Sequence, residues 1–279
     1  MMAQKLEVVK QVVKLTYFFG NGEAEGDASR EMVALLGNKG AQLQEMTRMG
    51  LPVPPGFTVT TDVCRYYFDN GQLPDGLMEA VRADIGRLEQ LTGSRFGDAE
   101  NDPLLVSARS GAAVSMPGMM ETILNIGLTD KVVDAYIQRH DFEGQAVRFI
   151  LDCQRRLYEM FGENVLGIKK EEFRKLFDGI KEDVGVKDDT QLAPSHLETL
   201  VVSYKQLYER NGKEMPQDPF QQLEAAIKAV EESAMGEKAK AYRKAEGLPE
   251  KVYTGVTVQM MVYGNENTEN CGTGVGFTR

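Results

Sequence analysis

The first third of the chain alternates short apolar runs with glycine-rich turns, a pattern typical of an α+β domain. Two of the runs are strand-like: FTVTT at 57–61 follows a Pro-Pro-Gly turn, and LLVSA lies at 104–108. Between them, residues 39–49 carry Leu43 and Met46 at helical spacing and are followed by Gly50. This spacing predicts a short helix with an apolar face.

From about residue 129 to residue 212 the pattern changes to long amphipathic stretches with few strand-forming residues, which predicts a helical insert. Asp218 and Pro219 then suit the N-cap and first position of another helix. Apolar residues follow them at helical spacing: Phe220, Leu223, Ile227 and Val230. We expect this helix to pack on the sheet of the first segment.

Residues 253–265, YTGVTVQMMVYGN, return to the alternation of a strand. One face would carry Val256, Val258, Met260 and Val262, and the other Thr257, Gln259 and Met261. The changes in pattern divide the chain into a first α+β subdomain (1–128), a helical insert (129–212), a helical return (213–252) and the start of a second α+β subdomain (253–279). Because the last residues resemble the beginning of a strand, we expect the chain to be part of a longer protein.

Charge and composition narrow the function classes. The net charge of -10 argues against a nucleic-acid or anionic-membrane surface, because the average field repels phosphates, although a local pocket for a small anion stays compatible. No apolar stretch reaches the length of about 18 residues that spans a membrane, and lysines interrupt the N-terminal apolar run. The three cysteines are Cys64, Cys153 and Cys271. Their odd number and wide spacing argue against a disulfide framework and favour a reducing, cytoplasmic location.

Three short segments carry chemistry suited to an anion. In GNKGAQLQEM, glycines frame Lys39 ahead of a helix, where backbone amides attract anions; a plain turn with a surface lysine is the alternative. In SARSGAAVSMPGMMET, Arg109 follows the strand at 104–108 and could clamp phosphate oxygens, or pair with a carboxylate structurally. In CGTGVGFT, three glycines could form a phosphate lid or an ordinary hairpin turn.

The remaining polar and methionine residues point less clearly to a site. His140 and His196 both fall in the helical region, where a surface or capping role is the expectation. Met116, Met119 and Met120 either fill the core or line an adaptable pocket near the glycine and proline of their loop.

Taken in order, these segments resemble the nucleotide-binding N-terminal domain of the pyruvate, phosphate dikinase family. The family pattern runs GGKG, GxPVPxGFTVTT, PLLVSxRSGAxxSMPGMMDTILNxGL, VQxMVxGN and SGTGVAFTRNPxTG. Here the matching stretches are GNKG, GLPVPPGFTVTT, PLLVSARSGAAVSMPGMMETILNIGL, VQMMVYGN and CGTGVGFTR. The resemblance covers nearly the whole chain from Tyr17 onward, and the MPGMM run separates it from phosphoenolpyruvate synthases, which share only the lysine and the arginine.

The resemblance implies an ATP-grasp-like fold, in which ATP lies between two α+β subdomains; here the second would be incomplete. The complete enzyme of the family converts ATP, inorganic phosphate and pyruvate into AMP, pyrophosphate and phosphoenolpyruvate with Mg2+. A carrier histidine on a separate domain passes the phosphoryl group to a pyruvate site in a TIM barrel, and the full-length protein would be a homodimer. The alternatives are a phosphoenolpyruvate synthase-like dikinase and a non-catalytic nucleotide-binding module.

By motif, the resemblance places Lys39 and Arg109 on the ATP phosphates. Met120 and Glu121 would lie at the nucleotide pocket. The remaining positions fall into an adenine side and a phosphate lid: Gln259, Met261 and Val262 in the first, Gly272, Thr273 and Gly274 in the second.

Several positions depart from the family pattern: Asn38, Ala113, Cys271 and Gly276. The family's metal-binding acidic residues, a phosphate-contacting glutamine and the carrier motif GGxTSHAAVVAR have no counterpart in these 279 residues. We therefore expect the metal ligands beyond residue 279, and expect the chain alone to lack turnover and to bind ATP weakly if at all.

Overall fold

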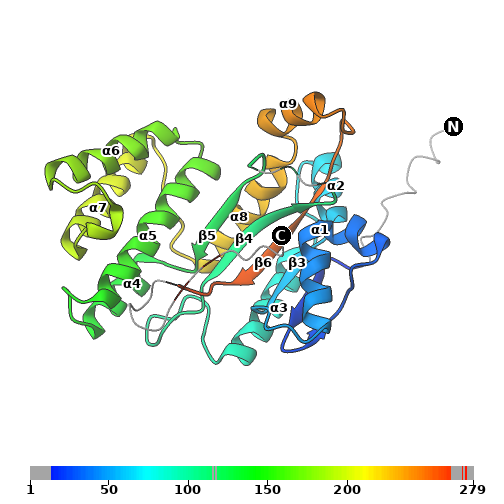
Figure 1. Ribbon diagram of the computed structural model, residues 1–279, viewed down its shortest axis with the longest axis horizontal. Coiled ribbons are helices and arrows are strands. Elements are labelled where there is room, and N and C mark those ends of the chain that lie inside the picture. The colour runs from blue at the N-terminus through cyan, green and yellow to red at the C-terminus, as the bar shows by residue number, and fades with distance from the viewer. Residues whose placement is uncertain (1–13, 115, 117, 265–271, 273, 275–279) are drawn as a thin grey trace.

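The computed structural model describes residues 14–114, 116, 118–264, 272 and 274, and in them a six-stranded antiparallel sheet is flanked by helices (Figure 1). The strand order is β2-β1-β3-β6-β4-β5. The strands are β1 (Thr16–Gly20), β2 (Glu23–Ala24), β3 (Gly56–Val59), β4 (Val106–Ala112), β5 (Thr122–Ile126) and β6 (Thr254–Met260). The last strand in sequence is thus inserted between β3 and β4, which ties the C-terminal part of the described chain to its first third.

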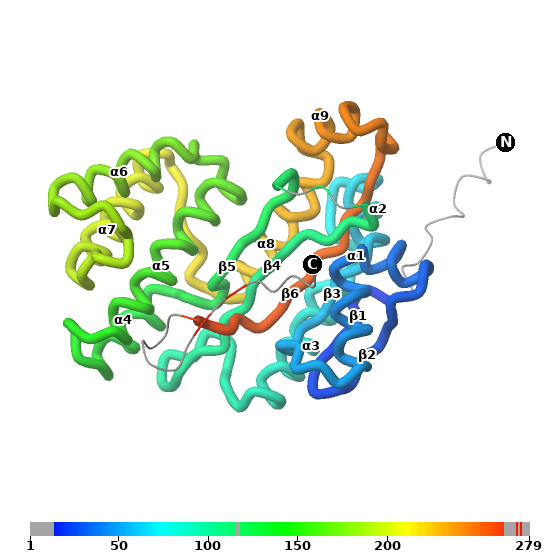
Figure 2. The backbone as a smooth tube through the Cα atoms, viewed as in Figure 1, coloured from blue at the N-terminus to red at the C-terminus, as the bar shows by residue number. Residues whose placement is uncertain are grey.

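Helices cover both faces and one edge of the sheet. They are α1 (Arg30–Arg48), α2 (Thr61–Asn70), α3 (Leu77–Thr92), α4 (Asp130–Arg139), α5 (Gln145–Asn164), α6 (Lys170–Asp183), α7 (Pro194–Arg210), α8 (Pro219–Ser233) and α9 (Glu237–Ala245), with a 3-10 turn at Asp189–Gln191. Helix α8 packs on β4, β5 and β6, and α3 packs on β1 and β3. Helices α4 to α7 gather beside β5, and α9 stands apart at the other side of α8 (Figures 1 and 2).

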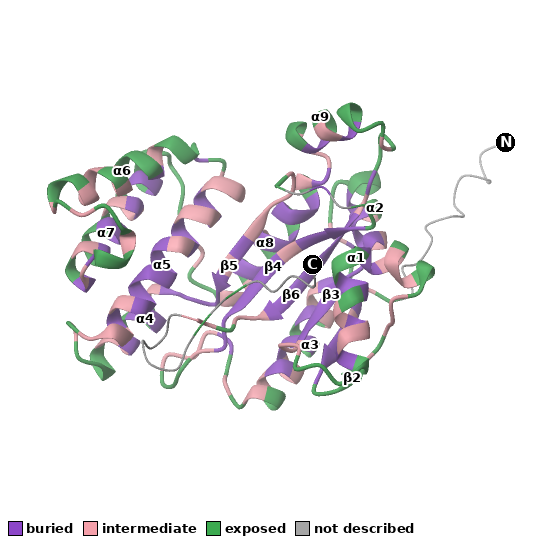
Figure 3. Ribbon diagram, in the orientation of Figure 1, coloured by how far each residue is buried: buried purple, intermediate pink, exposed green. Residues whose placement is uncertain are grey.

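The central strands are buried on both faces, but the two faces differ in chemistry (Figure 3). On one face, Val256 and Val258 join the main hydrophobic core with their neighbours on β3 and β4. On the other face, Thr257 of β6 pairs with Thr58 of β3. On its β4 side, Thr257 is opposite Arg109 and Gln259 is opposite Ser107. The predicted alternation is therefore confirmed up to Met260. Its extension to Val262 was wrong, because β6 has ended there and Val262 is 65% exposed.

Helix α1 lies against the polar face of the sheet at glycine positions. Gly37 has a φ of 71°, which interrupts the helix, and a Cβ there would lie 1.5 Å from the carbonyl oxygen of Gly111 on β4. A Cβ on Gly255 of β6 would lie 2.6 Å from the carbonyl oxygen of Leu36. Only glycine fits such contacts, because it lacks the Cβ and tolerates positive φ. The backbone of α1 therefore approaches the backbones of β4 and β6 directly.

Two local predictions need correction. Arg109 was expected to follow a strand, yet it lies inside β4, because pairing with β6 continues through Ser110 to Ala112 and outweighs the low strand propensity of those small residues. The helix expected at 39–49 is present as the part of α1 that restarts after the Gly37 interruption and ends at Arg48, but its buried side differs from the predicted apolar face. Its buried side carries small and polar residues (Ala41, Gln44 and Thr47), while Leu43 and Met46 are only half-buried, because α1 faces a polar sheet surface.

The later helices agree with the sequence patterns. Asp218 caps α8 by accepting hydrogen bonds from the amides of Phe220 and Gln221, and Leu223, Ile227 and Val230 are fully buried toward the sheet. Residues 129–212 contain α4 to α7, as the amphipathic pattern predicts, although the division of the chain into subdomains stays a prediction. Helices α2 and α3 were missed, because their apolar residues are mixed with glycine and charged residues.

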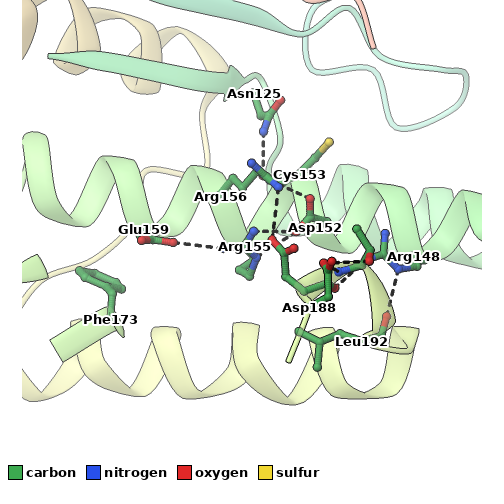
Figure 4. Close-up of polar contacts among 12 residues, drawn as sticks. Asn125, Arg148, Asp152, Cys153, Arg155, Arg156, Glu159, Phe173, Asp188 and Leu192 are labelled. Atoms are coloured by element: carbon green, nitrogen blue, oxygen red, sulfur yellow. Dashed lines mark hydrogen bonds and ion pairs between the residues drawn. The ribbon is translucent and has the colours of Figure 1, made fainter. Parts of the chain in front are cut away.

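Charged residues of α5 form an ionic network within that helix (Figure 4). Asp152 accepts hydrogen bonds from Arg155 at 2.7 Å and from Arg156 at 2.7 Å, and Arg155 also reaches Glu159 at 3.1 Å. Burial alone would raise the pKa of Asp152, but the two arginines outweigh it and hold that pKa below its ordinary value. Arg148 donates to the carbonyls of Asp189 and Leu192, which joins α5 to the segment before α7.

Glu231 on α8 is a fully buried carboxyl group of a different kind. Neither of its oxygens has a hydrogen-bond partner in the described part of the chain. Burial raises the pKa of this carboxyl from 4.5 to about 8, and the nearby Cys64 thiol, a weak donor, offsets this only in part. Glu231 is therefore protonated in the folded protein at neutral pH.

The close approach of the α1 backbone to β4 gives a first testable prediction. Replacing Gly37 with alanine should lower the free energy of unfolding by at least about 3 kcal/mol, because the new Cβ collides with the Gly111 carbonyl and the φ is unfavourable. Urea unfolding followed by circular dichroism measures this change. Gly86 on α3 is the matched control, since nothing lies within 4 Å of a Cβ there and alanine should stabilise by about 0.5–1 kcal/mol. Equal small effects at both positions would contradict the close approach.

A second prediction concerns Glu231 and pH. Between pH 4.5 and about 8 the folded protein keeps a proton on Glu231 that the unfolded chain has released, so stability falls as pH rises through this window. Within this window the proton on Glu231 lowers the free energy of unfolding by roughly 1.4 kcal/mol for each unit that the pH rises. Glu231→Gln, which cannot ionise, should flatten the decline between pH 5 and 8 in urea unfolding experiments. An identical pH profile in the two proteins would contradict the assignment.

Candidate functional site

Lys39 is placed by the restart of α1 after the Gly37 interruption. The residue as a whole is exposed, but its Nζ reaches inward and donates to the carbonyl oxygen of Ser110 on β4 at 2.8 Å. Partial burial lowers the pKa of the Lys39 ammonium, and the neighbouring positive charge of Arg109 lowers it further. The α1–sheet contact thus brings together two residues that are far apart in the sequence.

Arg109 lies in the middle of β4, opposite Thr257 of β6 and Thr122 of β5. Its Nη2 donates to the side-chain oxygen of Gln259. Its Nε is buried and has no acceptor among the described residues. Burial lowers the pKa of the guanidinium, although an arginine in a protein remains charged at neutral pH.

Neither cation has a carboxylate partner within ion-pair distance in the described ranges. Two adjacent, partly buried positive charges without a counter-charge are unfavourable by themselves. An anion bound between them would supply the missing charge and an acceptor for the free Nε of Arg109. The alternative of a structural Arg109–carboxylate pair has no support in this part of the chain.

Gln259 stands beside Arg109 on the polar face. It is 4% exposed, its side-chain oxygen accepts from Arg109, and its Nε2 donates to the carbonyl oxygen of Pro54 at 2.7 Å. Deeper on the same face, the hydroxyls of Thr58 and Thr257 lie 3.3 Å apart and satisfy each other. Lys39, Arg109 and Gln259 are therefore the predicted site residues that the fold brings together.

Met120 and Glu121 have other surroundings. Glu121 directly precedes Thr122, but its amide donates to Ser233 Oγ and its carboxylate lies 3.8 Å from Lys238 Nζ, toward α8 and α9 rather than toward Lys39. It lines a cavity of about 280 Å³ with residues of α5, α8 and α9. Met120 packs on a small cluster formed by Ala112, Met116 and Val252. Methionines of this loop thus contribute to a satellite core.

Met261 and Val262 follow the end of β6, where the Met261 amide donates to the carbonyl of Leu105. They are separated from the Met120 cluster by the length of β6, about 20 Å at 3.3 Å per residue. Gly272 and Gly274 are exposed and a Cβ on either would meet nothing within 4 Å. Thr273 lies outside the described residues. The roles assigned to these positions by resemblance stay predictions.

The two histidines lie at helix ends. His140 caps the C-terminus of α4, and the Nδ1 of His196 accepts from the Ala193 amide at the start of α7, as expected for capping residues. Cys64 and Cys153 are both buried and do not form a disulfide with each other. Across the described ranges, no group of three or more histidine, cysteine, aspartate or glutamate residues gathers to hold a metal ion. Nor does any helix in those ranges have the length and apolar character needed to cross a membrane.

Two features of the site were missed by sequence reasoning. The acceptor for Lys39 is a backbone carbonyl, which carries no signal in the residue types. The contact between Arg109 and Gln259 depends on the pairing of β4 with β6, in which Arg109 stands opposite Thr257 and Ser107 opposite Gln259. Strand alternation could have placed both side chains on one face once the pairing was known.

Comparisons with known proteins match the chain to one family. The family described as "Pyruvate phosphate dikinase, AMP/ATP-binding domain" matches residues 33–94 and 70–279. The chain is 45% identical over 258 residues to pyruvate, phosphate dikinase of Clostridium symbiosum, covering 91% of this chain and 29% of that protein. The corresponding protein of Rhizobium meliloti (strain 1021) is 45% identical over 270 residues, which are 96% of this chain and 29% of the relative.

A plant protein named pyruvate, phosphate dikinase 1, chloroplastic, from Arabidopsis thaliana, is 43% identical over 268 residues, covering 95% of this chain and 27% of the relative. The chain thus spans less than a third of the length of these curated relatives. With a family match over more than half of its residues, and relatives 45% identical over 91% and 96% of its length, the chain belongs to the pyruvate phosphate dikinase AMP/ATP-binding domain family.

Proposed function

We propose that the polar sheet face beneath α1 binds the phosphates of ATP, with Lys39 and Arg109 as the phosphate ligands. The observation that carries this proposal is the pair of adjacent cations without a carboxylate partner in the described chain, one of them with a buried and unsatisfied Nε. The family match supports ATP as the source of the phosphates.

The two cations have complementary roles. Lys39 is a compact charge on a flexible stem, so it can leave the Ser110 carbonyl and donate to a phosphate oxygen. Arg109 is held by its strand and presents a planar donor group suited to phosphate. In phosphoryl transfer, charge on the phosphate oxygens must be neutralised as the bond to the leaving oxygen breaks, and fixed cations do this without reorganising at that moment.

The surroundings of the two cations fit a polyphosphate but do not fit Mg2+. Magnesium prefers carboxylate oxygens and water, and no carboxylate pairs with Lys39 or Arg109 in the described ranges. The nucleotide contacts that the resemblance suggests for Met120, Glu121 and the glycines at 272 and 274 stay predictions, because Met120 and Glu121 contact a satellite core, α8 and α9 instead of Lys39. Met261 and Val262 would contact the base side.

For the whole protein that contains this chain, we propose pyruvate, phosphate dikinase activity. ATP, inorganic phosphate and pyruvate would be its substrates, and Mg2+ would be bound outside the described residues. Phosphohistidine-carrying and pyruvate-binding domains would be partners of this one, within a homodimer and an ATP-grasp-like arrangement. Cys64 and Cys153, which do not form a disulfide with each other, suit a reducing compartment such as the cytoplasm.

The phosphate-ligand assignment predicts the behaviour of two variants. Lys39→Ala and Arg109→Ala should each weaken ATP binding about ten- to hundredfold, the range for losing one charge-assisted hydrogen bond. NMR titration of the 279-residue chain with ATP measures this, with shifts mapped near β4 and α1. Lys240→Ala on α9, which removes an exposed lysine paired with Glu237, is the control and should bind like the unaltered chain. Unchanged affinity in both site variants would refute the assignment.

The lowered pKa of Lys39 predicts a pH effect. A bound anion favours the charged ammonium, so ATP affinity should fall as pH rises through the pKa of Lys39 in the free protein, starting below the ordinary lysine value of about 10.4. Lys39→Arg keeps its charge and should lack this alkaline decline. Binding measured at several pH values, with circular dichroism to check that the chain stays folded while Glu231 ionises, tests the effect. Parallel declines in the two proteins would count against Lys39 as a ligand.

A further inference from the structure

The side chain of Gln259 links Arg109 to a fixed point of the backbone. Its oxygen accepts from Arg109 Nη2, and its nitrogen donates to the Pro54 carbonyl at 2.7 Å. Rotating the carboxamide by half a turn would set its NH2 against the guanidinium donors and its oxygen against the Pro54 carbonyl. The two contacts therefore admit one orientation of the amide.

Gln259 is itself held firmly. It lies in the central strand β6, its backbone carbonyl accepts from Ser107 Oγ at 3.3 Å, and it pairs with Gly56 of β3. A Cβ on Gly56 would lie 2.9 Å from the Gln259 Cα and 2.4 Å from the Val258 carbonyl, so only glycine leaves room for β6 at this position. A rigid residue that contacts the guanidinium can fix its direction.

The Gln259 side chain that contacts Arg109 carries no charge. A carboxylate in place of this carboxamide would orient Arg109 equally well but would cancel its charge, and with it the attraction for phosphate. A glutamine accepts the hydrogen bond and leaves the positive charge available. Arg109 Nε, on the same guanidinium, stays unsatisfied and ready for a further acceptor.

We propose that Gln259 is a positioning residue that orients Arg109 toward phosphate, and that it does not read the nucleotide base. This inference rests on the proposed phosphate site, and it replaces the adenine-side role that the resemblance suggested. Both ends of the Gln259 carboxamide already have protein partners, whereas a base-reading glutamine would keep one end for the ligand.

The test compares ATP with inorganic tripolyphosphate, which lacks a base. Gln259→Met, close in size but without the hydrogen bonds, should weaken both ligands by the same factor, about tenfold. In the Arg109→Ala background the same change should have little further effect, because Gln259 acts through Arg109. A loss confined to ATP, an additive loss in the double variant, or no loss in either ligand would each overturn the inference.

Gln44 provides the matched control. It is also a fully buried glutamine that bridges two backbone groups, accepting from Gly26 and donating to the Tyr17 carbonyl, but it does not contact Arg109. Gln44→Met should cost stability without changing tripolyphosphate affinity. An equal loss of affinity in this variant would mean that loosening the fold, and not the orientation of Arg109, explains the Gln259 result.

A second readout does not need a ligand. In 15N NMR, the Arg109 Nη2–H that donates to Gln259 should exchange with water faster in Gln259→Met than in the unaltered chain or in Gln44→Met. Gln259→Glu, which keeps an acceptor, should leave this exchange slow while weakening tripolyphosphate binding. If the unaltered chain bound neither ATP nor tripolyphosphate, the proposed function would fail, and the exchange rates would still decide whether Gln259 holds Arg109.

Discussion

The backbone contact between α1 and the sheet is the constraint on which the rest of this structure depends. Gly37 and Gly255 let the helix approach β4 and β6 more closely than any side chain would allow. The Gly37 interruption also turns the helix so that Lys39 reaches Ser110. Without this contact, Lys39 would be an ordinary surface lysine and Arg109 an isolated charge in a strand.

The sheet supports this arrangement because its two faces have different chemistry. The apolar face of β6 packs into the main core and supplies the stabilising burial, with α8 and α3 on that side. The polar face is then available for threonine, glutamine and arginine side chains. Thr58 and Thr257 satisfy each other within this face, whereas Arg109 Nε has no acceptor among the described residues.

The contrast with α5 shows why the two site cations are informative. On α5, Arg155 and Arg156 are matched by Asp152 of the same helix (Figure 4). Lys39 and Arg109 have no such match in the described chain. Burial lowers the pKa of both, and the charge of Arg109 lowers the pKa of Lys39 further. A charge that the fold leaves unbalanced is available for a ligand, whereas a balanced one contributes to the architecture.

The sequence by itself determined the α+β class, the cap of α8, the strand at β6 and the helices of residues 129–212, and it singled out Lys39 and Arg109 as the residues on which the proposed anion site rests. Each of these depends on local spacing or on a motif. It could not place Arg109 inside β4, show that α1 buries Ala41 and Gln44 instead of Leu43 and Met46, or separate Glu121 from Lys39. Those outcomes follow from strand pairing and close backbone contact between distant segments, which local residue patterns do not encode.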